Sequence, residues 1–108
     1  MQKELLEKVK MTLPEGDCYL EYYMVRHPMI ALPSQLNLIK CGVEVIKRSC
    51  DNLEIIESKM ISDVCFSTEK MSSMISVLAR NTVTPVSLRD VLEILLTEDE
   101  EDTLAPAF

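Results

Sequence analysis

Glycine, tryptophan and histidine are scarce in this 108-residue chain, which holds two glycines, no tryptophan and one histidine. Five prolines complete a small supply of turn-forming residues. An all-β domain with many short strands needs more turns, so this composition favours helices. The single histidine allows no His-His metal pair, and Gly16 and Gly42 alone cannot build a phosphate-binding loop. We therefore expect no enzymatic activity, no cofactor and no metal site.

Clustered basic residues are also lacking, and the densest basic group is Lys47-Arg48. The formal net charge is −7, but the run EDEED at 98–102 holds five of the 18 acidic residues. The rest of the chain, with 13 acidic and 11 basic residues, is nearly neutral. A nucleic-acid binder needs a basic surface that neutralises phosphates, so direct binding of nucleic acid is not expected.

No uninterrupted apolar run approaches the 18 residues of a membrane-spanning helix. The first ten residues, MQKELLEKVK, are charged throughout and contain no apolar segment of the kind found in signal peptides. The sequence therefore predicts neither a membrane span nor secretion.

The four cysteines, Cys18, Cys41, Cys50 and Cys65, show no C-x-x-C spacing. Each lies among apolar residues, where a free cysteine behaves as a small hydrophobic residue. We expect reduced thiols and hence an intracellular protein, cytoplasmic or nuclear. A thiol- or metal-dependent activity that combines these cysteines with His27 is a less favoured alternative.

Helical spacing of apolar residues recurs along the chain. Residues 2–13 place their apolar side chains on one helical face, and residues 18–25 are apolar enough for a buried helix. In 36–53, apolar residues recur in alternating steps of three and four, the period of a coiled-coil seam. Further apolar residues widen this face, which favours packing against several neighbours. Asp51 can cap a new helix, so a helical hairpin is favoured over one long helix.

Three further helices are expected after that break. The first covers about 52–66, and Ser67 or Thr68 can cap the next, which ends near residue 80. A continuous helix through 66–68, and even one spanning 36–80, remains an alternative at this stage. The last helix begins at the N-cap Ser87 and ends in the acidic run.

These segments predict an all-α fold, a compact bundle of five to six short helices. The helical domain covers residues 1–97, and the acidic residues 98–108 are expected to be a disordered tail. The same helices can be grouped into three pairs. The alternative fold is therefore an end fragment of an armadillo- or HEAT-like α-solenoid.

The chain has seven methionines in addition to many aliphatic residues. Together they supply more apolar surface than a small bundle can bury. Methionine is flexible and suits adaptable binding surfaces. We therefore predict a non-enzymatic protein–protein interaction module, a subunit or adaptor of a larger complex, whose partner is another protein or a second copy. A capping piece of a helical-repeat scaffold is the alternative. The predicted partner-binding residues share an apolar helical face: Leu36, Ile39, Met60, Met71, Met74 and Leu78.

Overall fold

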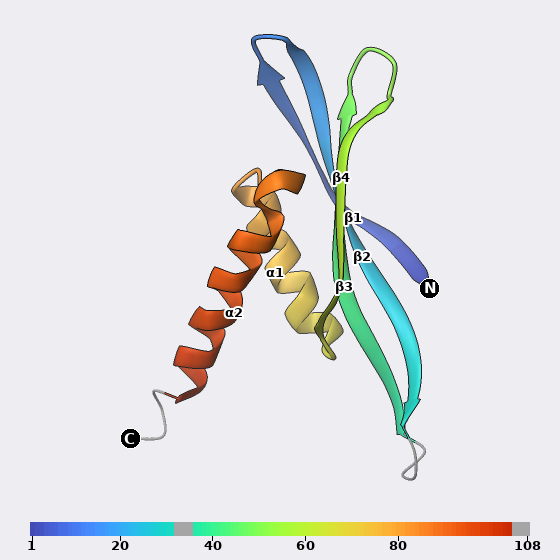
Figure 1. The fold of residues 1–108 in the computed structure, drawn as a ribbon, viewed down its shortest axis with the longest axis vertical. Helices are drawn as coiled ribbons and strands as arrows, with labels where there is room; N and C mark the ends of the chain where they lie inside the picture. Colours follow the sequence, from blue (N-terminus) through green and yellow to red (C-terminus); the bar gives the residue numbers. More distant parts are fainter. Residues whose placement is uncertain (32–35, 105–108) are drawn as a thin grey trace.

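A computed structural model describes the backbone of residues 1–31 and 36–104, and the side chains within 1–29 and 38–98. Four long strands form one antiparallel sheet in chain order: β1 (Gln2–Leu13), β2 (Gly16–Ala31), β3 (Leu36–Ser49) and β4 (Ile55–Cys65). The helical elements follow: α1 (Thr68–Arg80), the short 3-10 helix η1 (Pro85–Ser87) and α2 (Leu88–Leu104). Both α-helices lie on one side of the sheet, and α1 packs across all four strands (Figure 1).

The predicted all-α bundle is wrong, and so is its α-solenoid alternative. The segments expected as helices between residues 2 and 66 are the four strands of the sheet. The scarcity of glycine misled the prediction because four long strands in sequential order need only three connections. One of these is the turn at 14–15, and another is formed with Leu53 at φ 61°.

The apolar spacing in 36–53 does not mark a helical face. In a strand, residues three positions apart point to opposite faces, so Val43 faces the helices and Ile46 faces away. Both are nevertheless buried, as are Tyr22 and Val25 on the neighbouring strand β2. Because the two central strands bury residues on both faces, they lack the alternation by which a half-exposed strand is recognised.

Both helices begin where the sequence predicts, and α1 also ends there, but α2 continues through the acidic run that was predicted to be a disordered tail. Ser67 is the N-cap of α1, and its Oγ accepts a hydrogen bond from the backbone N–H of Lys70 at 3.1 Å. Asn81 is the C-cap. Ser87, the predicted cap of the last helix, ends η1 directly before α2. The backbone of α2 continues to Leu104, and residues 105–108 of the predicted tail lie outside the described residues.

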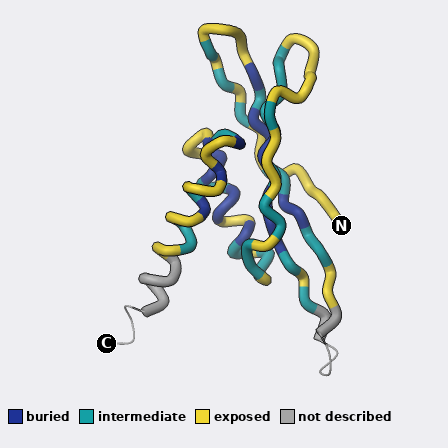
Figure 2. Tube along the Cα trace, viewed as in Figure 1, coloured by how far each residue is buried: buried dark blue, intermediate teal, exposed yellow. Residues whose placement is uncertain are grey.

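The hydrophobic core lies between the sheet and the helical layer, and buried residues occur along both layers (Figure 2). The Tyr22 hydroxyl donates a hydrogen bond to the backbone carbonyl of Val83 at 2.8 Å and so fixes the loop after α1 to β2. Burial raises the pKa of Tyr22, which keeps this donor protonated. The fully buried residues with the largest side chains in this core are Leu20, Tyr22, Met24, Met71, Ile75, Leu78 and Leu88.

Gly42 on β3 lies directly against the backbone of β4. Opposite this residue, β4 has extra residues, 62–64, that interrupt the regular pairing as a bulge. A Cβ atom at Gly42 would meet the carbonyl oxygen of Ile61 and lie 2.6 Å from Cα of Ser62. Since both contacts are with backbone, the bulge requires glycine at this position.

Candidate interaction surface

Exposed apolar side chains gather along strand β4 and its flanks. Five large apolar residues between positions 53 and 66 are at least 37% exposed: Leu53, Ile55, Ile56, Met60 and Phe66. The other exposed large apolar residues are distributed singly over the remaining elements of the described chain. A concentration of apolar surface on one segment is typical of an interaction site.

Strand β4 is also an edge of the sheet. It pairs with β3 on one side, and the described part of the chain places no strand on its other side. The backbone N–H and C=O groups on that side therefore lack strand partners, and such a row accepts an additional strand. The apolar side chains and the open hydrogen-bonding edge thus belong to the same segment.

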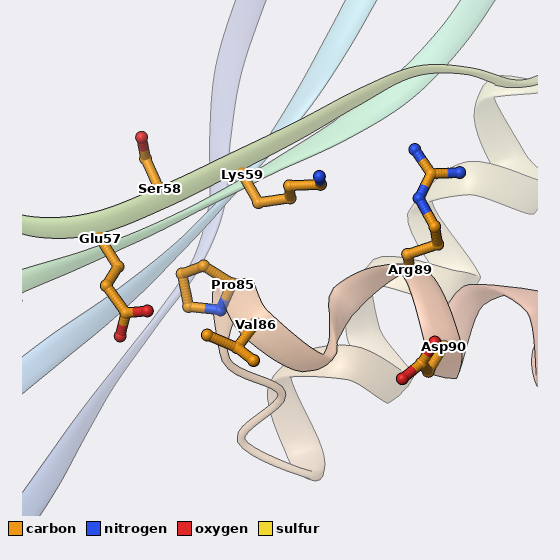
Figure 3. Close-up of a pocket in the computed structure, with 7 residues that line it drawn as sticks. All are labelled: Glu57, Ser58, Lys59, Pro85, Val86, Arg89 and Asp90. Carbon is orange, nitrogen blue, oxygen red and sulfur yellow. The ribbon is translucent and has the colours of Figure 1, made fainter.

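Between two irregularities, β4 has a short regular stretch. Ile56 is an extra residue in the pairing with β3, and the bulge at 62–64 follows, so the regular part is 57–61. Within it, Glu57 and Lys59 point toward the helical layer, whereas Ser58 points to the opposite side (Figure 3). Met60 shares the face of Ser58 by the alternation of the strand. The two charged side chains of this stretch therefore lie on the helical side, and the exposed Met60 lies on the other side.

An open pocket of about 340 Å³ lies between β4 and the beginning of α2 (Figure 3). Its wall carries charges of both signs, from Glu57 and Lys59 on β4 and from Arg89 and Asp90 on α2. Val86 beside it is 77% exposed. A strand added along β4 would present alternate side chains to this pocket, which could distinguish between sequences. The complete lining is Glu57, Ser58, Lys59, Pro85, Val86, Arg89 and Asp90.

The sheet face away from the helices carries polar groups that are paired within the chain. Lys3 Nζ lies 2.7 Å from Glu44 Oε1, and Arg48 Nε lies 2.8 Å from Glu21 Oε1. The Tyr23 hydroxyl donates to the same Glu21 oxygen at 2.9 Å. Burial acts to raise the pKa of Glu21, but the hydrogen bonds from Arg48 and Tyr23 outweigh it and lower the pKa. This network supports the sheet.

The opposite edge of the sheet, β1, has a different character. Its exposed positions include Lys3, Glu4, Lys8 and Lys10. Glu4 pairs with Arg26 at 2.8 Å, and the ammonium group of Lys8 lies 4.2 Å from the centre of the Tyr19 ring. Charged residues along an edge strand discourage pairing with other chains. Of the two edges, β4 is therefore the one suited to binding.

Three of the predicted partner-binding residues lie inside the chain. Met71, Met74 and Leu78 are on the face of α1 that packs against the sheet, and none is more than 8% exposed. Their helical spacing was recognised correctly, but the face they share is covered by the protein's own strands. They form part of the core and leave no surface there for a partner.

The other three predicted residues lie on strands. Met60 is exposed on β4, whereas Ile39, 41% exposed, pairs with Pro28 on a two-stranded extension of β2 and β3. Leu36 begins β3, and its side chain lies outside the described residues. The structure does not bring the six together. Ile55 and Ile56 are not among the predicted residues, although two adjacent β-branched residues before an alternating stretch favour a strand.

The four cysteines are free thiols. Cys18 and Cys41 are buried, and burial raises the pKa of both thiols, which disfavours the reactive thiolate. Among the described residues, no group of three His, Cys, Asp or Glu side chains is placed to hold a metal ion. The geometry thus lends no support to the thiol- or metal-dependent alternative. Within the same residues, no helix is both long and apolar enough to cross a membrane.

Comparison with known proteins identifies one family. The model of a family of unknown function (DUF6514) matches residues 1–98 of the chain. No curated protein and no solved structure matches the chain significantly. The matched region includes the whole sheet, α1 and the beginning of α2, so both β4 and the adjacent pocket lie within it.

Proposed function

The chain belongs to this family of unknown function, DUF6514, and we propose that it is a protein–protein interaction module that binds its partner along the edge strand β4. In this proposal it acts by binding, as a subunit or adaptor of a larger complex, and has no catalytic role. Its four free cysteines suit a reducing compartment, so we place it inside the cell, in the cytoplasm or nucleus.

The observation that carries the proposal is the coincidence of two features on β4. The strand offers an open row of backbone hydrogen-bonding groups, and Ile55, Ile56 and Met60 on it are exposed. Strand addition uses both, since main-chain hydrogen bonds supply affinity and side-chain contacts supply selectivity. Burying a fully exposed side chain of this size contributes about 1.5–3 kcal/mol, and these side chains, already partly buried, would each contribute roughly half of that.

The proposal is tested by recovering partners from an extract of the source cells with a tagged chain. We compare the natural chain with the double variant Ile56→Lys, Met60→Lys, which places two charges on the β4 edge. The natural chain should recover a stoichiometric partner, either another protein or an untagged copy of itself. The double variant should recover at least about tenfold less, because a loss of 1.4 kcal/mol in binding already has that effect.

A matched control is Ile94→Lys on α2. Ile94 is 57% exposed, similar to Ile56 at 52%, but it lies away from the edge strand. This variant should recover the same partner in the same amount as the natural chain. Equal recovery with the β4 double variant, or selective loss with the Ile94 variant, would refute the assignment of the binding edge.

A further inference from the structure

We propose that the strand bound by β4 is β4 of a second copy, paired antiparallel about a two-fold axis at Ser58. This inference rests on the proposed function, because it names the partner of the same edge. This pairing joins the two sheets into one continuous sheet of eight strands, four from each chain. It is carried by the order of charges along the regular part of β4.

Symmetry limits the ways in which β4 can pair with itself. An antiparallel pair of identical edge strands is related by a two-fold axis perpendicular to the sheet. Such an axis keeps the helical layers of both copies on the same side, so paired residues must share a face. The axis must then pass midway between one residue and the same residue of the second copy. Each register is therefore defined by one central residue.

Only one register near the centre of the regular stretch is complementary in charge. Centred on Ser58, it places Glu57 opposite Lys59 of the second copy, and this ion pair forms twice. Centring on Glu57 would oppose two glutamates, and centring on Lys59 would oppose two lysines. Like charges directly opposite one another destabilise a strand pair, whereas opposite charges stabilise it.

The same register also pairs the exposed apolar residues. It places Met60 opposite Ile56 of the second copy, and this apolar pair also forms twice. Ile55 and Ile56 are more than half exposed in the single chain. Apolar cross-strand pairs of this kind contribute to sheet stability, so the register buries surface that one chain leaves in water.

The pairing also fits the rest of the molecule. Glu57 and Lys59 point to the helical side, beside the pocket lined by Val86 and Arg89, so the new ion pairs would border that pocket in both copies (Figure 3). The edges left at the ends of the joined sheet are the two β1 strands. These carry the lysine and glutamate residues that discourage further pairing, so assembly ends at two copies.

Charge substitutions test the register directly. The natural chain should sediment as a dimer, with twice its 12.3 kDa mass. Lys59→Glu places glutamate opposite glutamate, and Glu57→Lys places lysine opposite lysine, so each variant alone should dissociate at least about tenfold more readily. An equimolar mixture of the two variants should form a heterodimer. One β4 strand then has glutamate at positions 57 and 59, and the strand opposite has lysine at both.

The mixture makes the experiment independent of folding defects, since a misfolded variant would not regain association with its counterpart. Lys10→Glu is the control for Lys59→Glu, since it makes the same charge reversal on the opposite edge of the sheet. This variant should leave the dimer unchanged. The inference is overturned if the natural chain is a monomer at every soluble concentration, or if the mixture associates no better than its components. If a different protein is still recovered with the natural chain and lost with the β4 double variant, the proposed function stands and only the second copy is excluded.

Discussion

Replacing Gly42 with valine should destabilise the protein by about 3 kcal/mol or more. The new Cβ would meet the carbonyl oxygen of Ile61 and Cα of Ser62, which belong to the bulge of β4. Backbone atoms cannot rotate away as a flexible side chain can, so β4 would have to move from β3. The free energy of unfolding, measured by urea denaturation of dilute protein, gives the effect.

Thr12→Val is the control for this substitution. Thr12 is an exposed residue of β1, so valine there adds a branched side chain to the sheet without a backbone clash. Its effect should stay within about 0.5 kcal/mol, as for ordinary surface substitutions. A Gly42→Val protein as stable as this control would show that β4 does not approach β3 as the pairing requires.

Leu78→Ala should lower the free energy of unfolding by about 2–5 kcal/mol. Leu78 is fully buried between α1 and the sheet, and truncating its side chain leaves a cavity that the packed strands cannot fill. This substitution also separates two interpretations of one residue, since the sequence analysis assigned Leu78 to a partner surface. A core residue changes stability, whereas a surface contact residue changes partner binding and leaves the isolated chain as stable as before.

Ile94→Ala provides the comparison for Leu78. It removes a similar amount of side chain from a helix, but Ile94 is 57% exposed on α2. The change in unfolding free energy should be within about 0.5 kcal/mol. Similar small effects for both substitutions, measured in dilute protein, would contradict the burial of α1 against the sheet.

The helices could be predicted from sequence because their signals are local. The cap at Ser67 and the i, i+3, i+4 spacing of Met71, Met74 and Leu78 are complete within one segment. The face of α1 was therefore correctly identified. Most of what covers that face belongs to β1, β2 and β3, more than 20 residues before Met71, and no local pattern contains that information.

The strands could not be recognised because their environment differs from that of a half-exposed sheet. In β3, Val43 and Ile46 are buried on opposite faces, so apolar residues occur at both odd and even positions. Steps of three and four between such residues then imitate a helix by coincidence. A strand pair buried on both faces is a tertiary arrangement, and it overrode the weak helical preference of the segment.

The interaction surface shows the same division between local and tertiary information. Met60 is predicted as part of an apolar helical face, but its exposure follows from the position of β4 at the edge of the sheet. The charge order Glu57-Ser58-Lys59 is readable in the sequence, yet it gains meaning only once these residues are known to lie on an unpaired strand. The prediction of an interaction module thus stays a proposal, now attached to an edge strand instead of a helical face.

Backbone hydrogen exchange, followed by mass spectrometry at low and high protein concentration, tests the role of β4 most directly. Amides that face the open edge exchange quickly in a single chain and become protected when a strand is added. We predict slower exchange within residues 55–61 at high concentration, with exchange in β1 unchanged. Exchange in 55–61 that is the same at both concentrations, or new protection in β1 instead, would contradict association through β4.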